Sequence, residues 1–201
     1  MTISRNKNGF TLIELITVIS IILILMGLLF PAVSSVKEAA KKAQAKNDIT
    51  NLVTSVKAYY TEYGKYPLPQ SLYSSTPEED LTYNDKSGTA TLIAFMKILM
   101  AKDTTENPRQ IVFIEPPTAK QDGKYGVFLD SSNNPGPFYD PWGKPYSVRI
   151  DVDYNNLIRS PDNDAVLLPT GVAAFSNGKD KGHEYNSPSN PLNVDDVATY
   201  K

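Results

Sequence analysis

Residues 9–33 read GFTLIELITVISIILILMGLLFPAV, an apolar segment that decides how the rest of the chain is interpreted. Between Phe10 and Phe30 the segment holds one ionisable residue, Glu14. An apolar helix of about 20 residues is long enough to span a bilayer. A carboxylate inside such a helix is costly and by default marks function, because it needs a partner once the helix has left water. We therefore expect a subunit whose helix is first stored in a membrane and then packs against copies of itself.

A short, polar and basic stretch precedes the apolar segment, with Arg5 and Lys7 as its charges. By the positive-inside rule these charges hold the N-terminus in the cytoplasm, so the rest of the chain faces the periplasm or the exterior. An ordinary secretory signal has a shorter apolar core and a small-residue cleavage site. An inert membrane anchor has no need of Glu14. A secretory signal and an inert membrane anchor therefore both fit this segment less well than a functional helix.

The apolar segment continues into an amphipathic helix. Pro31 predicts a kink, because proline removes a backbone donor and clashes with the preceding turn. Gly64 is a natural C-terminal cap and Pro67 prevents continuation, so one helix is predicted over residues 10–63. Apolar residues in its second half recur on one helical stripe, namely Ile49, Leu52, Val53, Val56, Tyr59, Tyr60 and Tyr63.

The remainder of the chain carries weaker signals, and residues 68–139 contain no functional motif that we can interpret. A second helix is predicted over residues 89–102, and alternation predicts a half-buried strand with Val148 and Ile150 inward and Arg149 and Asp151 outward. The predicted fold class is α+β: a long N-terminal helix packed on a small antiparallel sheet, with a helical insertion and a C-terminal loop. Strands are predicted at residues 111–114, 126–129, 146–152, 157–158, 166–168 and 171–175.

The heptapeptide Gly-Phe-Thr-Leu-Ile-Glu-Leu after a basic leader resembles the processing site of type IV pilins and of the pseudopilins of type II secretion systems. This resemblance implies that a prepilin peptidase cleaves after Gly9 and methylates the new N-terminus at Phe10. It also implies that Glu14 pairs with the N-terminal amine of a neighbouring subunit. The implied parts are a leader (1–9), a transmembrane and filament-core helix (10–33), the amphipathic half of that helix (34–66) and a periplasmic globular domain (67–201).

Two further stretches resemble the major pseudopilins. Residues 63–67 (YGKYP) look like the end of their long helix, and residues 140–146 (DPWGKPY) look like the turn that leads into their sheet. Proline and glycine set the geometry of such a turn. Trp142, the single tryptophan of the chain, is predicted to fill the core between helix and sheet. We assign this turn no catalytic role.

The C-terminal residues 176–201 are rich in Asp, Asn, Gly and Ser. Calcium requires several hard oxygen ligands on a permissive turn, although the same composition also describes a solvated acidic loop. In major pseudopilins the matching loop binds a calcium ion. The resemblance implies carboxylate ligands from Asp180, Asp195 and Asp196 and a backbone carbonyl from Asn177. Lys181 departs from the family pattern, which usually has glycine at this position.

Composition argues against several other classes of protein. Cysteine is absent, which excludes a cysteine nucleophile and disulfides, and the single histidine, His183, is expected to be an exposed loop residue. The chain has no Gly-x-Ser-x-Gly elbow, no phosphate-binding P-loop and no zinc-type ligand set. A net charge of −2 without a dominant basic patch argues against nucleic acid as the main partner. We do not expect an enzyme.

The function that the resemblance implies is that of a structural subunit of a periplasm-spanning pseudopilus. The single-pass subunit waits among inner-membrane lipids, and an assembly platform driven by a cytoplasmic ATPase extracts it into a helical filament. A type IV pilus pilin for adhesion, motility or DNA uptake stays an alternative, as do a minor pseudopilin and a membrane-anchored binding module with an incidental Glu14. The lack of cysteine favours the pseudopilin, because large pilins commonly end in a cysteine-bridged loop.

Overall fold

The computed structural model describes residues 10–69, 80–83, 89–187 and 189–200, without the side chains of Leu28, Pro31, Ala32 and Thr89. The architecture is α+β, as predicted, and residues 1–40 and 41–201 form two compact units. The helices are α1 (Leu12–Tyr63), α3 (Thr89–Leu99) and the short 3-10 helix η1 (Pro191–Asn193). The strands are β1 (Leu81–Tyr83), β2 (Gly126–Leu129), β3 (Pro135–Tyr139), β4 (Ser147–Ile150), β5 (Ile158–Arg159), β6 (Leu167–Leu168), β7 (Val172–Ser176) and β8 (Val197–Ala198).

Helix α1 runs for 52 residues, which confirms the single long helix predicted from the sequence. Its backbone is helical through Pro31, and the kink expected there stays a prediction. Gly64 ends the helix at φ +67°, and its N–H donates to the carbonyl of Tyr60 at 2.8 Å. A side chain would make this left-handed conformation unfavourable, so glycine stops the helix where the sequence predicted.

The first part of α1 presents apolar side chains to solvent. Every side chain that the structure describes between Phe10 and Lys37 is exposed. Among them are Phe10 at 79% exposure and Phe30 at 72%. Judged on the described residues and their side chains, no helix is long and apolar enough to cross a membrane.

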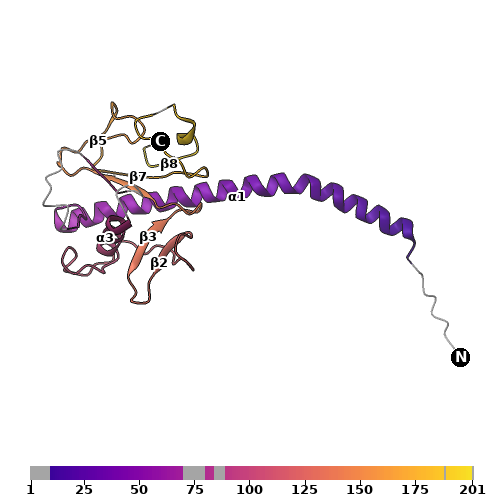
Figure 1. The fold of residues 1–201 in the computed structure, drawn as a ribbon, viewed down its shortest axis with the longest axis horizontal. Helices are drawn as coiled ribbons and strands as arrows, with labels where there is room; N and C mark the ends of the chain where they lie inside the picture. Colours follow the sequence, from indigo (N-terminus) through magenta and orange to yellow (C-terminus); the bar gives the residue numbers. More distant parts are fainter. Residues whose placement is uncertain (1–9, 70–79, 84–88, 188, 201) are drawn as a thin grey trace. The chain divides into compact units, whose positions relative to one another are not determined.

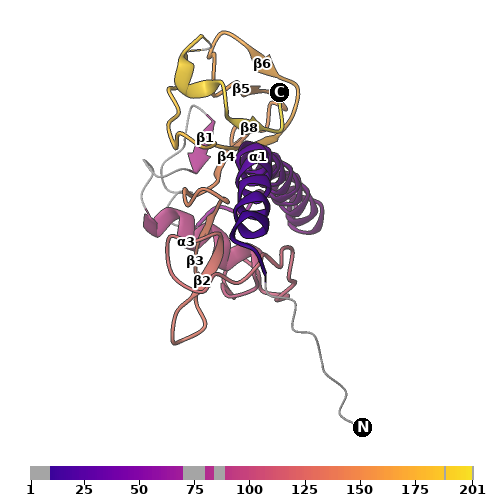
Figure 2. The same cartoon turned by 90° about the vertical axis from the view of Figure 1, so that its right-hand side faces the viewer.

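The second part of α1 supplies one wall of the hydrophobic core. Four residues of the predicted stripe, Ile49, Leu52, Val56 and Tyr59, are at most 1% exposed, and Ala45 joins them. Val53 and Tyr63 are half-buried. Tyr60 is 39% exposed with its ring stacked on that of Tyr66, so its place on the covered stripe was predicted wrongly. Figures 1 and 2 show β7, β8 and the C-terminal loop on one side of this part of α1, with α3 and the β2–β3 hairpin on the other. The apolar face is therefore covered by elements that come from distant parts of the sequence.

The main sheet has the order β1-β4-β7-β8, and each neighbouring pair is antiparallel. Its centre is the β4–β7 pair, with Ile150 opposite Val172 and Val148 opposite Ala174. Strands β2 and β3 form one separate hairpin, and β5 and β6 form another. The strand predicted at residues 126–129 is confirmed as β2, and those predicted at 146–152, 157–158, 166–168 and 171–175 are confirmed as β4 to β7 with shifted ends.

Residues 111–114 form no strand, so that prediction is wrong. Asn107 binds both backbone groups of Ile111, accepting from its N–H at 3.1 Å and donating to its carbonyl at 2.7 Å. The N–H of Phe113 donates to the carbonyl of Leu99 at the end of α3. These local partners satisfy the backbone without a neighbouring strand. The helix predicted over residues 89–102 also ends early, at Leu99, and Ala101 adopts a left-handed conformation at φ 57°.

The turn at residues 140–146 is organised by the buried carboxylate of Asp140. Its Oδ1 accepts from the N–H groups of Trp142 and Lys144 at 2.9 Å each, and its Oδ2 accepts from the hydroxyl of Ser176 at 2.6 Å. Burial raises the pKa of Asp140 in spite of these hydrogen bonds. Trp142 is 8% exposed and belongs to the core, as predicted.

A second buried carboxylate, Asp48, lies on the core side of α1 at 3% exposure. It accepts hydrogen bonds from Tyr146 at 2.7 Å and from Gln44 at 3.0 Å. Burial nevertheless raises the pKa of Asp48, because desolvation of the charged form outweighs these hydrogen bonds. Ionised Asp48 therefore lowers the free energy of unfolding at neutral pH.

We predict that Leu52→Ala destabilises the globular unit by about 2–5 kcal/mol, because it removes a fully buried side chain and leaves a cavity. Urea unfolding of a fragment of residues 34–201, which holds the whole core, measures the change. Lys57→Ala on the exposed face of α1 is the control and should stay within about 0.5 kcal/mol. Equal losses for the two variants would show that this stripe does not hold the domain together.

Asp48→Asn should change how stability depends on pH. A raised pKa in the folded state means that folding favours protonated Asp48, so wild-type stability falls as pH rises through that pKa. Asparagine does not titrate, so the melting temperature of the variant relative to wild type should increase between pH about 4 and about 7. Glu115→Gln, at an exposed position, is the control. A difference from wild type that stays constant with pH would contradict the assignment.

Candidate functional site

The amino-terminal end of α1 carries two of the predicted processing and assembly residues. Gly9 lies outside the described residues, and Phe10 is exposed directly before the helix. The carboxylate of Glu14 accepts from the backbone N–H of Thr11 at 2.9 Å and from its hydroxyl at 2.5 Å. The N–H of Glu14 donates in return to the Thr11 hydroxyl at 3.3 Å. This reciprocal pattern is a capping box, which fixes the start of the helix.

The other polar side chains of this apolar helix are satisfied by the helix itself. The hydroxyl of Thr17 donates to the carbonyls of Ile13 and Glu14, and that of Ser20 donates to the carbonyl of Ile16. Such bonds leave neither hydroxyl in need of an outside partner. Glu14 differs, because an ionised carboxylate has about four acceptor positions and bonds to Thr11 alone do not neutralise its charge. The sequence pattern predicted a role for Glu14, and the capping role of Thr11 could have been predicted as well, because Thr-x-x-Glu is a helix-start pattern.

The predicted metal ligands lie around the two ends of the C-terminal loop, residues 177–196. Strands β7 and β8 flank this loop, and their register pairs Ser176 with Val197. The next positions along the same ladder are Asn177 and Asp196, so the register places these two predicted ligands opposite each other. Adjacent antiparallel strands thereby bring residues that are far apart in sequence close together. We call the place where residues 177–180 and 195–196 meet the neck of the loop.

Asp195 ties the two sides of this neck together. Its Oδ2 accepts from the N–H groups of Lys179 and Asp180 at 2.5 and 3.1 Å. Gly178 allows this approach at φ +67°, since a Cβ there would lie 2.6 Å from the carbonyl oxygen of Asp195. The carboxylate of Asp180 accepts from the N–H of Gly182 at 2.8 Å. The loop is therefore held by backbone contacts to carboxylates that the sequence analysis proposed as ligands.

His183 is buried, so the expectation of an exposed loop residue is wrong. Its side chain is 1% exposed, and its Nδ1 lies 2.6 Å from Oδ2 of Asp196. The ring packs against Phe175 and Tyr185 at centroid distances of 4.7 and 4.6 Å. Aromatic contacts and a charge-assisted hydrogen bond thus replace the hydration of the imidazole. The polar composition of the loop did not predict this burial.

Asn177 Oδ1, His183 Nε2 and Asp196 Oδ1 are the three buried side-chain atoms that form no hydrogen bond among the residues described. All three belong to the C-terminal loop. Buried polar atoms without a hydrogen bond are rare and often mark the position of a water or an ion. Carboxylate and amide oxygens among them suit a hard cation, whereas the imidazole nitrogen does not.

Two groups of three potential metal-ligand atoms lie within 4.8 Å of one another in the described chain, and the predicted trio of Asp180, Asp195 and Asp196 is neither of them. One group combines Asp196 with Asp162 and His183. The loop therefore gathers Asp196 with residues that the sequence analysis did not select. No motif announces this grouping, because it depends on the loop folding back beside residue 162.

The other group is Asp80, Asp151 and Asp153. Asp151 was predicted to face outward but is 1% exposed, because its carboxylate accepts from the N–H groups of Asn155 and Asn156 at 3.2 and 2.8 Å. Burial raises the pKa of Asp151, while a hydrogen bond from Asp151 lowers the pKa of Asp153. These contacts describe a tight turn after β4, and we assign it a structural role.

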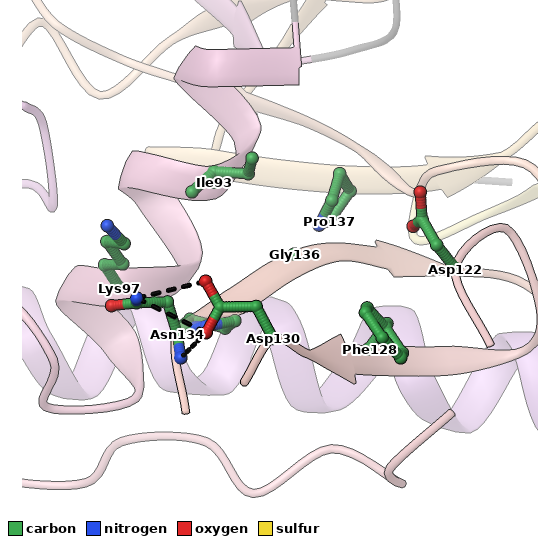
Figure 3. A pocket seen from close by; sticks show the side chains of 9 residues that line it. Ile93, Lys97, Asp122, Phe128, Asp130, Asn134, Gly136 and Pro137 are labelled. Atoms are coloured by element: carbon green, nitrogen blue, oxygen red, sulfur yellow. Dashed lines mark hydrogen bonds between the residues drawn. The ribbon is translucent and has the colours of Figure 1, made fainter. Parts of the chain in front are cut away.

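An open hollow of about 340 Å³ lies between α3 and the β2–β3 hairpin (Figure 3). Ile93 and Lys97 line it from the helix, and Phe128 and Pro137 line it from the hairpin. Asp130, which also lines the hollow, stabilises its own turn, since its carboxylate accepts from the N–H of Asn134 at 2.8 Å. Backbone and side-chain hydrogen bonds from Asn134 lower the pKa of Asp130. The lining joins apolar and charged groups without a nucleophile and base in contact.

Comparisons with known proteins find a match in the same N-terminal part of the chain that holds the exposed apolar helix and its capping box. Residues 4–30 match the family model described as the prokaryotic N-terminal methylation motif. The chain is 38% identical to the type II secretion system core protein G of Pseudomonas aeruginosa over 66 residues, 33% of this chain and 46% of the relative. It is 36% identical to the protein of the same name from Dickeya chrysanthemi over 63 residues, 31% of this chain and 41% of the relative.

The chain thus matches less than half the length of these two curated relatives. No solved structure matches the chain. The matched residues include Gly9, after which cleavage is predicted, as well as the exposed Phe10 and the capped Glu14. The first residues of the chain accordingly carry the prokaryotic N-terminal methylation motif, and about a third of the chain is similar to type II secretion system core protein G, in agreement with the resemblance that these residues predicted.

Proposed function

We propose that this protein is a self-assembling structural subunit of the periplasmic pseudopilus of a type II secretion system, and not an enzyme. The observation that carries the proposal is the exposed apolar part of α1, which begins at the methylation motif and contains a single carboxylate. Such a surface is far larger than a soluble monomer leaves uncovered. A second copy of the same helix is a suitable cover, because it offers the same apolar side chains along its whole length.

Assembly in this proposal follows from the position of Glu14. Prepilin peptidase cleaves after Gly9 and methylates Phe10, which creates a charged amine at the start of the helix. In the free subunit the Glu14 carboxylate is held by Thr11 of its own chain. In the filament it faces the amine of a neighbouring subunit, so each buried charge offsets the other. Contacts of this head-to-tail kind use two different surfaces of the subunit and build an open filament.

The proposed location before assembly is the inner membrane, with a single pass and the globular unit in the periplasm. The inner-membrane assembly platform then extracts the subunit from the lipid. A type IV pilus pilin is the alternative, since the methylation motif suits either filament. The similarity to type II secretion core protein G and the absence of cysteine favour the pseudopilus. A membrane-anchored binding module fits less well, because it gives the methylation motif no purpose.

We further propose that the C-terminal loop binds calcium at its neck. The resemblance implies a backbone carbonyl ligand from Asn177, and the side-chain Oδ1 of the same residue is also buried without a hydrogen-bond partner beside the start of the loop, which is the kind of position that a cation fills. Asp195 and Asp196 join it from the other side of the neck, and Asp180 adds a further carboxylate. Their existing hydrogen bonds to backbone N–H groups are compatible with this role, because carboxylates that bind metals are usually hydrogen-bonded as well. A bound ion would offset the net negative charge of this loop, in which four carboxylates face two lysines.

Glu14→Leu should leave membrane insertion and cleavage intact but strongly reduce filament formation. Removing one partner of a buried ion pair leaves the other charge uncompensated at a cost of about 3–5 kcal/mol. Filament yield from cells tests the assembly, and the mass of the membrane-extracted chain tests loss of residues 1–9 and gain of a methyl group. Ser20→Ala is the control, because its hydroxyl binds only its own helix in the structure. Normal filament yield from Glu14→Leu would refute the pairing.

Calcium should raise the melting temperature of a fragment of residues 34–201, and magnesium should not. A ligand that binds only the folded state at about 100 times its Kd stabilises by about 2.7 kcal/mol. For a domain of this size that corresponds to a shift of about 5–10 °C. Asp180→Ala should abolish the shift, whereas Glu115→Ala, an exposed acid outside the loop, should retain it. An unchanged melting temperature in wild type would make the tail a solvated loop.

A further inference from the structure

The C-terminal loop contains a buried histidine that none of the preceding functional arguments uses. We propose that His183 is the positioning residue of the calcium site: it holds the Asp196 carboxylate in the orientation that the ion requires. This inference rests on the calcium binding proposed above. It assigns a role to the single histidine of the chain, and it explains why that histidine is buried in an otherwise polar loop.

The contact between the two residues is short and shielded from water. His183 Nδ1 lies 2.6 Å from Asp196 Oδ2, and the two side chains are 1% and 0% exposed. A carboxylate that binds calcium is ionised, so Nδ1 must carry the hydrogen and donate it. A charge-assisted hydrogen bond in a dry site is strong and directional. It therefore restrains the rotation of the Asp196 carboxylate through Oδ2.

The imidazole is itself packed between aromatic side chains. Phe175 from β7 and Tyr185 contact the ring at centroid distances of 4.7 and 4.6 Å. At the far end, His183 Nε2 lies 3.9 Å from Asp162 Oδ1, and Tyr200 donates to the same oxygen at 3.3 Å. The aromatic packing and the short contact at Nδ1 together favour the ring orientation with Nδ1 toward Asp196. A rigid partner of this kind is what positioning a ligand requires.

The strand register completes the argument. Asp196 directly precedes β8 and stands opposite Asn177, whose buried Oδ1 accepts no hydrogen bond. Restraining Oδ2 through His183 leaves Oδ1 as the oxygen that Asp196 can offer at the neck. Preorganised carboxylates bind calcium more tightly because less freedom is lost on binding.

Two isosteric variants separate the hydrogen bond from the packing. The side-chain amide of His183→Asn places its N–H near the position of Nδ1 and so retains the bond to Asp196. The longer His183→Gln places its N–H near the position of Nε2 and so loses that bond. Val172→Ala on β7 is a control for stability alone, because Val172 is buried away from the loop ends. Each variant is prepared as the full chain in detergent micelles, with calcium removed by a chelator.

Calorimetric titration with calcium then gives the Kd, and thermal unfolding in chelator gives the stability without the ion. We expect His183→Gln to bind calcium about 10- to 100-fold more weakly than wild type, as is usual when the partner of a metal ligand is removed. His183→Asn should recover most of the affinity, and Val172→Ala should melt earlier but keep the wild-type Kd. A merely structural role for His183 would instead give affinity losses that follow the loss of stability.

Three results would overturn the proposal, and they are distinguishable. Calcium binding by wild type with an equal Kd for His183→Gln would remove His183 from the site while leaving the calcium proposal intact. No calcium binding by wild type would overturn the calcium site and this inference together. Binding of Zn²⁺ in preference to Ca²⁺ that is lost in both His183 variants would make His183 itself a ligand.

Discussion

The apolar face of α1 is the constraint on which the rest of the structure depends. One helix carries exposed apolar side chains at its start and a fully buried stripe from Ala45 onward. The domain covers the second part because sheet, α3 and loop elements all pack against it. Nothing in the described chain covers the first part. A helix built in this way has to obtain its remaining cover from outside the subunit, and that requirement connects the fold to the proposed assembly.

The sequence predicts the elements that follow from local chemistry. A period of 3.6 residues and a glycine after Tyr63 set the end of α1, and alternation sets the central strand β4. The DPWGKPY turn and its buried Trp142 follow from proline and glycine geometry together with the size of the indole ring. In each case the residues that determine the helix end, strand or turn lie within that same short stretch of chain, so the element can be predicted without the tertiary structure.

The features that could not be predicted depend on distant partners. Residues 111–114 look like a strand, but Asn107 and Leu99 capture their backbone groups. Asp151 looks like an outward residue of an alternating strand, but the N–H groups of a following turn draw it inward. His183 lies 13 residues from Asp196 in sequence, and only the folded loop brings the two together. At the proposed calcium site, likewise, composition indicates the ligand type but not which carboxylates meet.

Strand β8 determines when folding of the main sheet can be completed. β8 ends at Ala198, and the ammonium group of Lys46 on α1 donates to the Ala198 carbonyl, 152 residues away in sequence. Contacts between such distant residues form late, because the loop between them must close first. The sheet is therefore completed only after β8 has been synthesised. Until then β7 keeps an open edge, which exposes unpaired backbone groups to pairing with a strand of another chain.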